Sequence, residues 1–158
     1  MTGILLWIFC GICIVVDRVT KIWALRCLKP MSSITGIEGL LDFTFVENRG
    51  AAFGILQGQK WLFLLLTVIA AVVIIYYFIK LHRTNQYLAI RISLMLILAG
   101  AVGNVIDRVM YGYVVDFFDL TFMNWPVFNI ADICVVVGTI LLVIILIFFI
   151  KEEKRVEQ

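Results

Sequence analysis

The sequence predicts an all-α membrane protein with four transmembrane helices and a small extracytoplasmic β-sheet element in the first loop. Of its 158 residues, 63% are hydrophobic and 15% are charged, whereas soluble domains average about 45–50% apolar and about 25% charged residues. The mean hydropathy is +1.08. Such a chain cannot bury its apolar surface in one water-facing globule, so lipid must cover much of it. We expect residues 1–158 to form a single membrane domain.

Four apolar stretches are long enough to cross a membrane, and they predict helices at about residues 3–25, 61–79, 87–109 and 133–150. The clearest stretch contains no charged residue and lies between Lys60 and Lys80. At 1.5 Å per residue it spans about 28 Å, close to the hydrocarbon thickness of a bilayer. The first stretch could be a secretory signal peptide, but it lacks a basic start and an Ala-x-Ala cleavage site. A retained helix is the better interpretation.

The first loop contains the segment Leu40–Val46, which is rich in strand-forming residues and follows the turn residues Gly36 and Gly39. We therefore expect a β-element at about residues 33–56. Because an isolated strand pair is only marginally stable, this element should pack against the helix ends or the membrane surface.

The loop charges predict the orientation. Four helices place both termini on one side, and the basic residues of the middle connection and the tail are Lys80, His82, Arg83, Lys151, Lys154 and Arg155. The loop 110–131 contains no Lys or Arg. By the positive-inside rule, the termini and the middle loop are cytoplasmic. Arg26, Lys29 and Arg49 in the first loop oppose this assignment.

Several kinds of chemistry are disfavoured by the composition. A net charge of +2 without a basic block gives no sign of a nucleic-acid partner. The spacing of Cys10 and Cys13 suits a redox motif, but both lie in an apolar run, as Cys134 does, and packing is the better interpretation. The single histidine, His82, lies in the predicted cytoplasmic loop, which disfavours Ser-His and Cys-His catalysis. Zinc-type spacings and phosphate-binding loops are missing from the sequence, so we expect neither metal nor cofactor.

Polar residues gather toward the predicted outer ends of the helices, where ionisable groups usually face a bundle interior or a wet cavity. They are Asp17, Lys21, Asn104, Asp107, Arg108, Asp116, Asp119, Asn129 and Asp132. Structural explanations exist for some of them: ion pairs of Asp17 with Lys21 or of Asp107 with Arg108, and a helix N-cap at Asn129. These explanations account poorly for so many acids and amides converging at one depth from three elements.

With those other kinds of catalysis disfavoured, the carboxylates are the remaining candidates for catalytic groups. Two of them held together at low dielectric share a proton, so that one can activate water while its protonated partner polarises a carbonyl group. This arrangement hydrolyses peptides without a metal or a covalent intermediate. The residues alone leave the pair open among Asp107, Asp116, Asp119 and Asp132, although Arg108 beside Asp107 would hold that carboxylate ionised.

Five ordered blocks resemble the lipoprotein signal peptidases, also called signal peptidase II, over essentially the whole chain. The blocks are Asp17-Arg18-Val19-Thr20-Lys21, Asn48-Arg49-Gly50-Ala51-Ala52-Phe53-Gly54, Gly103-Asn104-Val105-Ile106-Asp107-Arg108, Val114-Val115-Asp116-Phe117 and Phe128-Asn129-Ile130-Ala131-Asp132. Each block is weak alone, but the ordered set is specific. Arg18 departs from the pattern, since many members carry Gln there.

The resemblance implies an aspartic endopeptidase of the bacterial cytoplasmic membrane, with Asp116 and Asp132 as its catalytic pair. The substrate-binding or supporting residues would be Asn48, Gly50, Asn104, Asp107, Arg108 and Asn129. Asp17 and Lys21 would support the fold. The implied substrates are diacylglyceryl-modified prolipoproteins, cut before the lipidated cysteine at the extracytoplasmic face. We expect a lipid-embedded monomer that needs no metal.

Two other functions fit parts of the sequence. A small proton-coupled membrane transporter or channel component would also use intramembrane carboxylates. Four helices are few for such a carrier, however, and no inverted repeat is visible. A purely structural membrane subunit explains the hydropathy but leaves the polar residues without a role.

Overall fold

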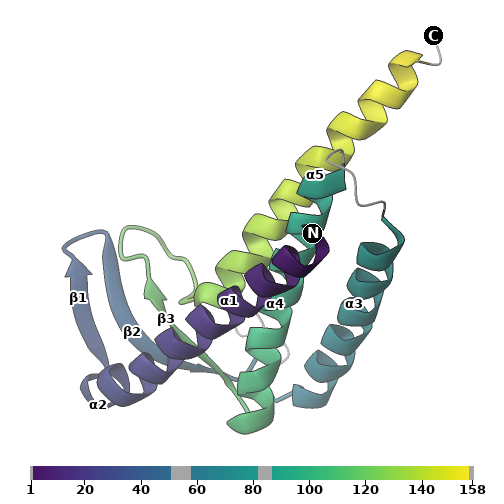
Figure 1. Cartoon of the computed structure of the whole chain (residues 1–158). Coiled ribbons are helices and arrows are strands. Elements are labelled where there is room, and N and C mark those ends of the chain that lie inside the picture. The colour runs from purple at the N-terminus through teal and green to yellow at the C-terminus, as the bar shows by residue number, and fades with distance from the viewer. Residues whose placement is uncertain (1, 51–57, 82–86, 157–158) are drawn as a thin grey trace.

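The computed structural model describes residues 2–50, 58–81 and 87–156. Within these residues, four helices are long and apolar enough to cross a membrane. They are α1 (Thr2–Trp23), α3 (Lys60–Lys80), α4 (Leu88–Met110) and α5 (Ile130–Val156) (Figure 1). The predicted four-helix membrane fold is thereby confirmed, and the chain is a multi-pass membrane protein.

The helix α1 continues beyond its regular part into the π-helical segment η1 (Ala24–Leu28) and the single turn α2 (Lys29–Met31). Pro30 lies at the start of α2, where its missing N–H group leaves no helical hydrogen bond unmade. Ser32 then adopts a φ of 67° and ends the helical path. The chain can therefore turn back into the first strand directly after the span.

A three-stranded antiparallel sheet lies beside the helices, with the strand order β1-β2-β3. Its strands are β1 (Ser33–Ile37), β2 (Leu41–Asn48) and β3 (Val114–Asp119). The first two form the predicted element of the first loop, whereas β3 follows α4 in a segment that was predicted to be a loop. The β-branched and aromatic residues from Val114 to Phe118 were the available signal for this strand.

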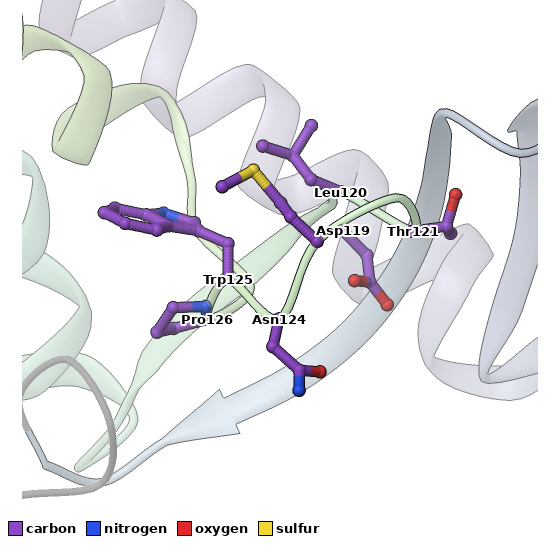
Figure 2. Close-up of a pocket in the computed structure, with 7 residues that line it drawn as sticks. Asp119, Leu120, Thr121, Asn124, Trp125 and Pro126 are labelled. Carbon is purple, nitrogen blue, oxygen red and sulfur yellow. The ribbon is translucent and has the colours of Figure 1, made fainter.

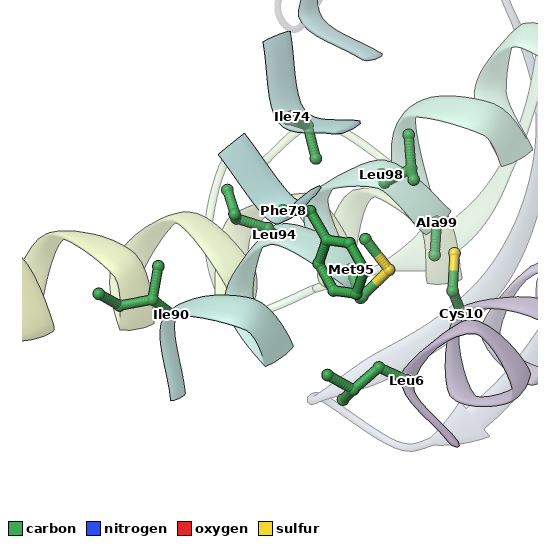
Figure 3. Packing of buried hydrophobic residues seen from close by; sticks show 9 residues of the cluster. All are labelled: Leu6, Cys10, Ile74, Phe78, Ile90, Leu94, Met95, Leu98 and Ala99. Atoms are coloured by element: carbon green, nitrogen blue, oxygen red, sulfur yellow. The ribbon is translucent and has the colours of Figure 1, made fainter. Parts of the chain in front are cut away.

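The centre of the bundle is α4, which contacts α1, α3 and α5. An apolar core fills the space between α1, α3 and α4 (Figure 3), made of Leu6, Cys10, Ile74, Phe78, Ile90, Leu94, Met95, Leu98 and Ala99. The thiol of Cys10 is part of this core, as the packing interpretation predicts. Most of the other large apolar side chains of α1, α3 and α5 point outward, which suits helices that lipid surrounds.

A second apolar cluster, formed by Ala24, Leu28, Val115 and Phe117, joins η1 to the sheet. Side chains alternate between the two faces of a strand. Because Val115 and Phe117 point toward η1, Asp116 between them points to the opposite face. The packing of the sheet against the helix end thus fixes the direction of this carboxylate.

Two glycines of α4 allow a close approach to neighbouring elements. A Cβ atom at Gly100 would lie 2.2 Å from the carbonyl oxygen of Ala131, and one at Gly103 would lie 2.6 Å from Oδ2 of Asp17. Both positions therefore exclude a larger side chain.

Some predictions fall outside the described residues. These are the positions of His82 and Arg83, and residues 51–56 of the predicted β-element with Ala51, Ala52, Phe53 and Gly54. The side chains of Lys151, Lys154 and Arg155 also lie outside the described part. In Figure 1, α1 begins and α5 ends on the side of the bundle away from the sheet. Which side is cytoplasmic remains a prediction from the loop charges.

Candidate active site

A polar cluster lies where α1 and α4 end, α5 begins and β3 passes beside them. It brings together residues from all five blocks of the sequence: Asp17, Lys21, Asn48, Gly50, Asn104, Asp107, Arg108, Asp116, Asn129 and Asp132. Five of these, Asp17, Lys21, Asp107, Asp116 and Asn129, are at most 1% exposed. Buried polar groups of this kind have to satisfy one another.

The ammonium group of Lys21 is the centre of one half of the cluster. Its Nζ lies 3.0 Å from Oδ2 of Asp17 and 3.0 Å from Oδ2 of Asp107, and it donates to Oδ1 of Asn104 at 3.0 Å. Oδ1 of Asp17 accepts a 3.0 Å hydrogen bond from the backbone N–H of Ala131. The predicted Asp17–Lys21 pair therefore exists, and it ties α1 to α4 and to the start of α5.

The carboxylate of Asp107 is fully occupied. It forms ion pairs with Lys21 and Arg18 and accepts a 3.1 Å hydrogen bond from the backbone N–H of Val115. Arg18 also donates to the Tyr111 hydroxyl at 3.3 Å. In the sequence, Arg18 is visible only as a departure from the family pattern, and its contact with Asp107 was not predicted. Its spacing of three residues from Lys21 on one helix face was the available signal.

The suggested ion pair between Asp107 and Arg108 is wrong. Consecutive residues point about 100° apart around a helix, so the two side chains diverge. Arg108 instead donates to the carbonyl oxygen of Gly50 at 3.3 Å, and its guanidinium lies 4.7 Å from the centre of the Phe63 ring. Its positive charge also acts on the carboxylates of Asp132 and Asp116.

The carboxyl group of Asp116 is 1% exposed and has two amide donors. Asn129 Nδ2 donates to Oδ1 at 2.7 Å, and Asn48 Nδ2 donates to Oδ2 at 2.8 Å. Burial raises the pKa of Asp116 to about 7, and the negative charge of Asp132 adds to the rise, although both amides oppose it. Asp116 therefore retains a proton at pH values where an ordinary aspartate has lost it.

The carboxylate of Asp132 lies in the first turn of α5 and, unlike Asp116, is partly exposed. Oδ1 accepts from Asn104 Nδ2 at 2.8 Å, and Oδ2 accepts from the backbone N–H of Asn129 at 3.1 Å. In return, the Asp132 N–H donates to Oδ1 of Asn129 at 2.9 Å. This reciprocal pair is a capping box, which confirms the N-cap interpretation. The side chain of Asp132 therefore accepts from two donors at the N-terminal end of α5.

The end of β2 contacts Asp116 and Arg108. Asn48, which binds Asp116, accepts a 3.0 Å hydrogen bond on Oδ1 from the backbone N–H of Gly50. Because the Gly50 carbonyl contacts Arg108, the Asn48–Gly50 turn is attached to both β3 and α4. The two predicted residues of the first loop, Asn48 and Gly50, thus contact the polar cluster at Asp116 and Arg108.

The remaining acidic candidate, Asp119, belongs to a different part of the sheet. It lies opposite Asp42 in the β2–β3 register and lines an open pocket with Leu120, Thr121, Met123, Asn124, Trp125 and Pro126 (Figure 2). Neither Asp116 nor Asp132 lines this pocket. Side chains three positions apart in a strand point to opposite faces, which explains why Asp116 and Asp119 separate.

The arrangement of Asp116 and Asp132 suits acid–base hydrolysis of an amide. Asn129 contacts both side chains, of which Asp116 is buried and has a raised pKa, whereas Asp132 is partly exposed. The part of the chain that the structure describes holds no group of three or more His, Cys, Asp or Glu residues placed to bind a metal ion.

Comparison with known proteins identifies the family. The family model described as Signal peptidase (SPase) II matches residues 9–148. The chain belongs to the signal peptidase II family. The resemblance drawn from the five sequence blocks is thereby confirmed, and membership of the signal peptidase II family makes the chain a membrane peptidase.

Individual relatives of this signal peptidase II chain match along most of their length. The lipoprotein signal peptidase of Clostridium novyi (strain NT) is 47% identical over 144 residues, covering 89% of this chain and 94% of the relative. That of Clostridium acetobutylicum is 49% identical over 145 residues, covering 90% and 92%. A solved structure described as a bacterial membrane enzyme superposes with a TM-score of 0.85 at 36% identity, covering 90% of this chain and 87% of the other.

Proposed function

We propose that this signal peptidase removes the signal peptide of prolipoproteins by aspartyl chemistry, with Asp116 and Asp132 as its catalytic residues. The observation that carries the proposal is the pairing of a buried carboxyl that retains a proton with a partly exposed carboxylate, both bound to Asn129. Asp107 is less suited, because both of its oxygens are bound in ion pairs with Arg18 and Lys21. Asp119 is less suited because it lies outside the polar cluster.

In the proposed reaction, Asp132 takes a proton from a water molecule, which attacks the scissile carbonyl carbon. Asp116 meanwhile donates its proton to the carbonyl oxygen, which stabilises the tetrahedral intermediate. When the intermediate collapses, Asp132 passes the water-derived proton to the leaving amine and Asp116 recovers its own. Both residues return to their initial states, and no covalent enzyme intermediate forms.

The neighbouring residues have supporting roles in this proposal. Asn104 and Asn129 orient Asp132 through its two oxygens, and Arg108 lowers the cost of negative charge at both acids. Asn48 and Gly50 border the position of the substrate backbone. Asp17, Lys21 and Asp107 hold the helix ends and β3 in register, and act on the reaction only through the residues they position.

A substrate anchored in the membrane suits this position of the site. A diacylglyceryl group contributes about 0.8 kcal/mol per buried methylene, so it keeps the lipidated cysteine at the bilayer surface. A peptidase with its acids at the helix ends reaches the bond before that cysteine without extracting the lipid. We accordingly place the site at the extracytoplasmic face and both termini in the cytoplasm, in a chain that works as a monomer.

The catalytic assignment is tested with purified protein and a synthetic diacylglyceryl-modified lipobox peptide. Asp116→Asn and Asp132→Asn should each lower kcat/KM by about 10²–10⁴-fold, the usual effect of removing a general acid or base. Asp119→Asn is the matched control, and its rate should remain near that of the unmodified protein. Full activity in a folded Asp116→Asn or Asp132→Asn variant would exclude the pair.

The same assay tests the cleavage site and the need for metal. Mass spectrometry should show one cut, directly before the lipidated cysteine, and the unlipidated peptide should react much more slowly. A chelator should leave the rate unchanged. A cut elsewhere, or loss of activity that added metal restores, would contradict this part of the proposal.

The proposed orientation can be tested with the exposed free thiol of Cys27, in η1. A membrane-impermeant maleimide added to intact spheroplasts should label this residue, and a Cys27→Ser variant should show the background. The predicted topology is wrong if labelling requires permeabilised cells.

A further inference from the structure

One end of the sheet carries exposed apolar side chains. Here the β1–β2 turn and the loop after β3 meet, since the backbone N–H of Thr121 donates to the Leu40 carbonyl at 3.2 Å. We call residues 37–40 and 120–126 the sheet tip. Its exposed large apolar residues are Ile37, Leu40, Phe122, Met123 and Trp125, each 44–59% exposed. In water, such a patch would carry a substantial hydration cost.

The composition of the loop indicates what covers it. From Leu120 to Ala131 the chain contains no charged residue, although Phe122 and Trp125 are exposed. In Figure 2 the side chains of Leu120 and Trp125 point to one side of the loop, whereas those of Asp119 and Asn124 point to the other. A loop with one apolar side and one polar side suits the boundary between acyl chains and headgroups.

The sheet tip is also continuous with the membrane-spanning surface. The loop leads directly into α5, whose span begins at Ile130. Five residues of fully extended chain reach at most about 18 Å, so Trp125 lies within that distance of the span. The exposed apolar side chains of α5 continue from Ile133 onward. Tryptophan and other amphipathic aromatic residues are enriched at this depth in membrane proteins.

We infer that the sheet tip inserts into the phospholipid leaflet on the side of the polar cluster and anchors the sheet there. Because β3 carries Asp116 and ends next to the tip, this contact fixes the height of the carboxylate above the acyl chains. The inference rests on the exposure and the composition of the tip. It does not depend on the catalytic roles proposed above.

The test measures the depth of a fluorescent label in phospholipid vesicles. A chain whose four cysteines are replaced by Ala receives Met123→Cys at the tip, or Ser33→Cys at the opposite end of β1, and each thiol is coupled to an environment-sensitive dye. Lipids with a quenching nitroxide on the upper acyl chain should quench the dye at residue 123 at least about twofold more than the dye at residue 33. Retained peptidase activity shows that the labelled chains are folded.

Three results would overturn the inference. In the first, the two labels are quenched equally, which places the tip in water. In the second, the apolar environment that the dye at residue 123 reports is lost as the protein is diluted into more lipid. A second copy of the chain then covers the tip. In the third, the dye at residue 123 reports an apolar environment only after lipopeptide is added. The tip then binds the substrate rather than membrane lipid. Quenching that is independent of dilution and of substrate supports the lipid anchor.

Discussion

Nδ2 of Asn129 donates a 2.7 Å hydrogen bond to Oδ1 of Asp116. The same side chain caps α5 through its oxygen, which accepts from the backbone N–H of Asp132. One residue thus begins the fourth span and joins the two proposed catalytic acids, so helix capping and acid placement are a single arrangement. Any displacement of the α5 start would separate the pair.

Peptidase activity should depend on pH through Asp116. Burial raises the pKa of Asp116 to about 7, and the proposed reaction needs this group protonated. kcat/KM for the lipopeptide should therefore fall as the pH rises through about 7. A profile that stays flat from pH 6 to 9 would contradict the acid role of Asp116.

Asn48→Ala should move the fall in kcat/KM to higher pH. The amide of Asn48 donates to Oδ2 of Asp116 and stabilises the ionised form, so its removal raises the pKa of Asp116 further. Asn124→Ala, at the sheet tip, is the matched control and should leave the pH of this fall unchanged. A shift to lower pH in Asn48→Ala would show that the hydrogen bond serves the protonated form.

The thermal stability of the folded protein should also depend on pH through the raised pKa of Asp116. Because the folded pKa of Asp116 lies above its ordinary value of 3.8, the folded state binds this proton more tightly than the unfolded state does. Stability from this group is fully present below about pH 4 and declines as the pH rises to about 7. In detergent, Tm of the unmodified protein should fall from pH 5 to pH 8 more than that of Asp116→Asn. Equal slopes would argue against a raised pKa.

Two lysines should differ sharply in their effect on stability. Lys21→Met leaves Asp17 and Asp107 buried without their shared cation, and breaking such a buried pair costs about 3–5 kcal/mol. Lys29 pairs with Glu47 while its side chain is 48% exposed, so Lys29→Met should cost far less, because solvent screens an exposed ion pair. Chemical denaturation in detergent measures both. Similar costs for the two substitutions would refute the structural role of Lys21.

Gly103→Ala should destabilise the protein, because the new methyl group meets Oδ2 of Asp17 at 2.6 Å and Cβ of Ala131 at 3.1 Å. Overpacking of this kind costs about 1–3 kcal/mol. Gly11→Ala, on α1, has nothing within 4 Å of the new atom and should not lower Tm. If Gly103→Ala is as stable as Gly11→Ala, then α4 and α1 are not held as closely as described.

The helices were predictable because the solvent determines them: an uncharged run such as that from Trp61 to Ile79 has few alternatives to a spanning helix. The strand β3 was not, because six residues give a weak signal and the partner β2 lies about 70 residues earlier in the chain. The position of Asp116 depends on that pairing. Its separation from Asp119 therefore became visible only in the structure.

The members of the site were predictable as a group, whereas their contacts were not. Helix spacing correctly paired Asp17 with Lys21, since both belong to one element. Adjacency in the sequence wrongly suggested Arg108 as the partner of Asp107, which pairs instead with Lys21 and Arg18 of α1. Contacts between elements depend on how the helices rotate about their axes, which periodicity within one helix does not determine.

The coupling of the two acids is tested most directly by titrating the carboxyl group of Asp116. Carbon-13 NMR of protein labelled at the aspartate Cγ can follow this group, with Asp116→Asn used to assign its signal. In the unmodified protein the signal should titrate near pH 7, and in Asp132→Asn it should titrate at lower pH because the neighbouring negative charge is gone. An ordinary carboxyl titration in both proteins would contradict the proposal that Asp116 and Asp132 act as a pair.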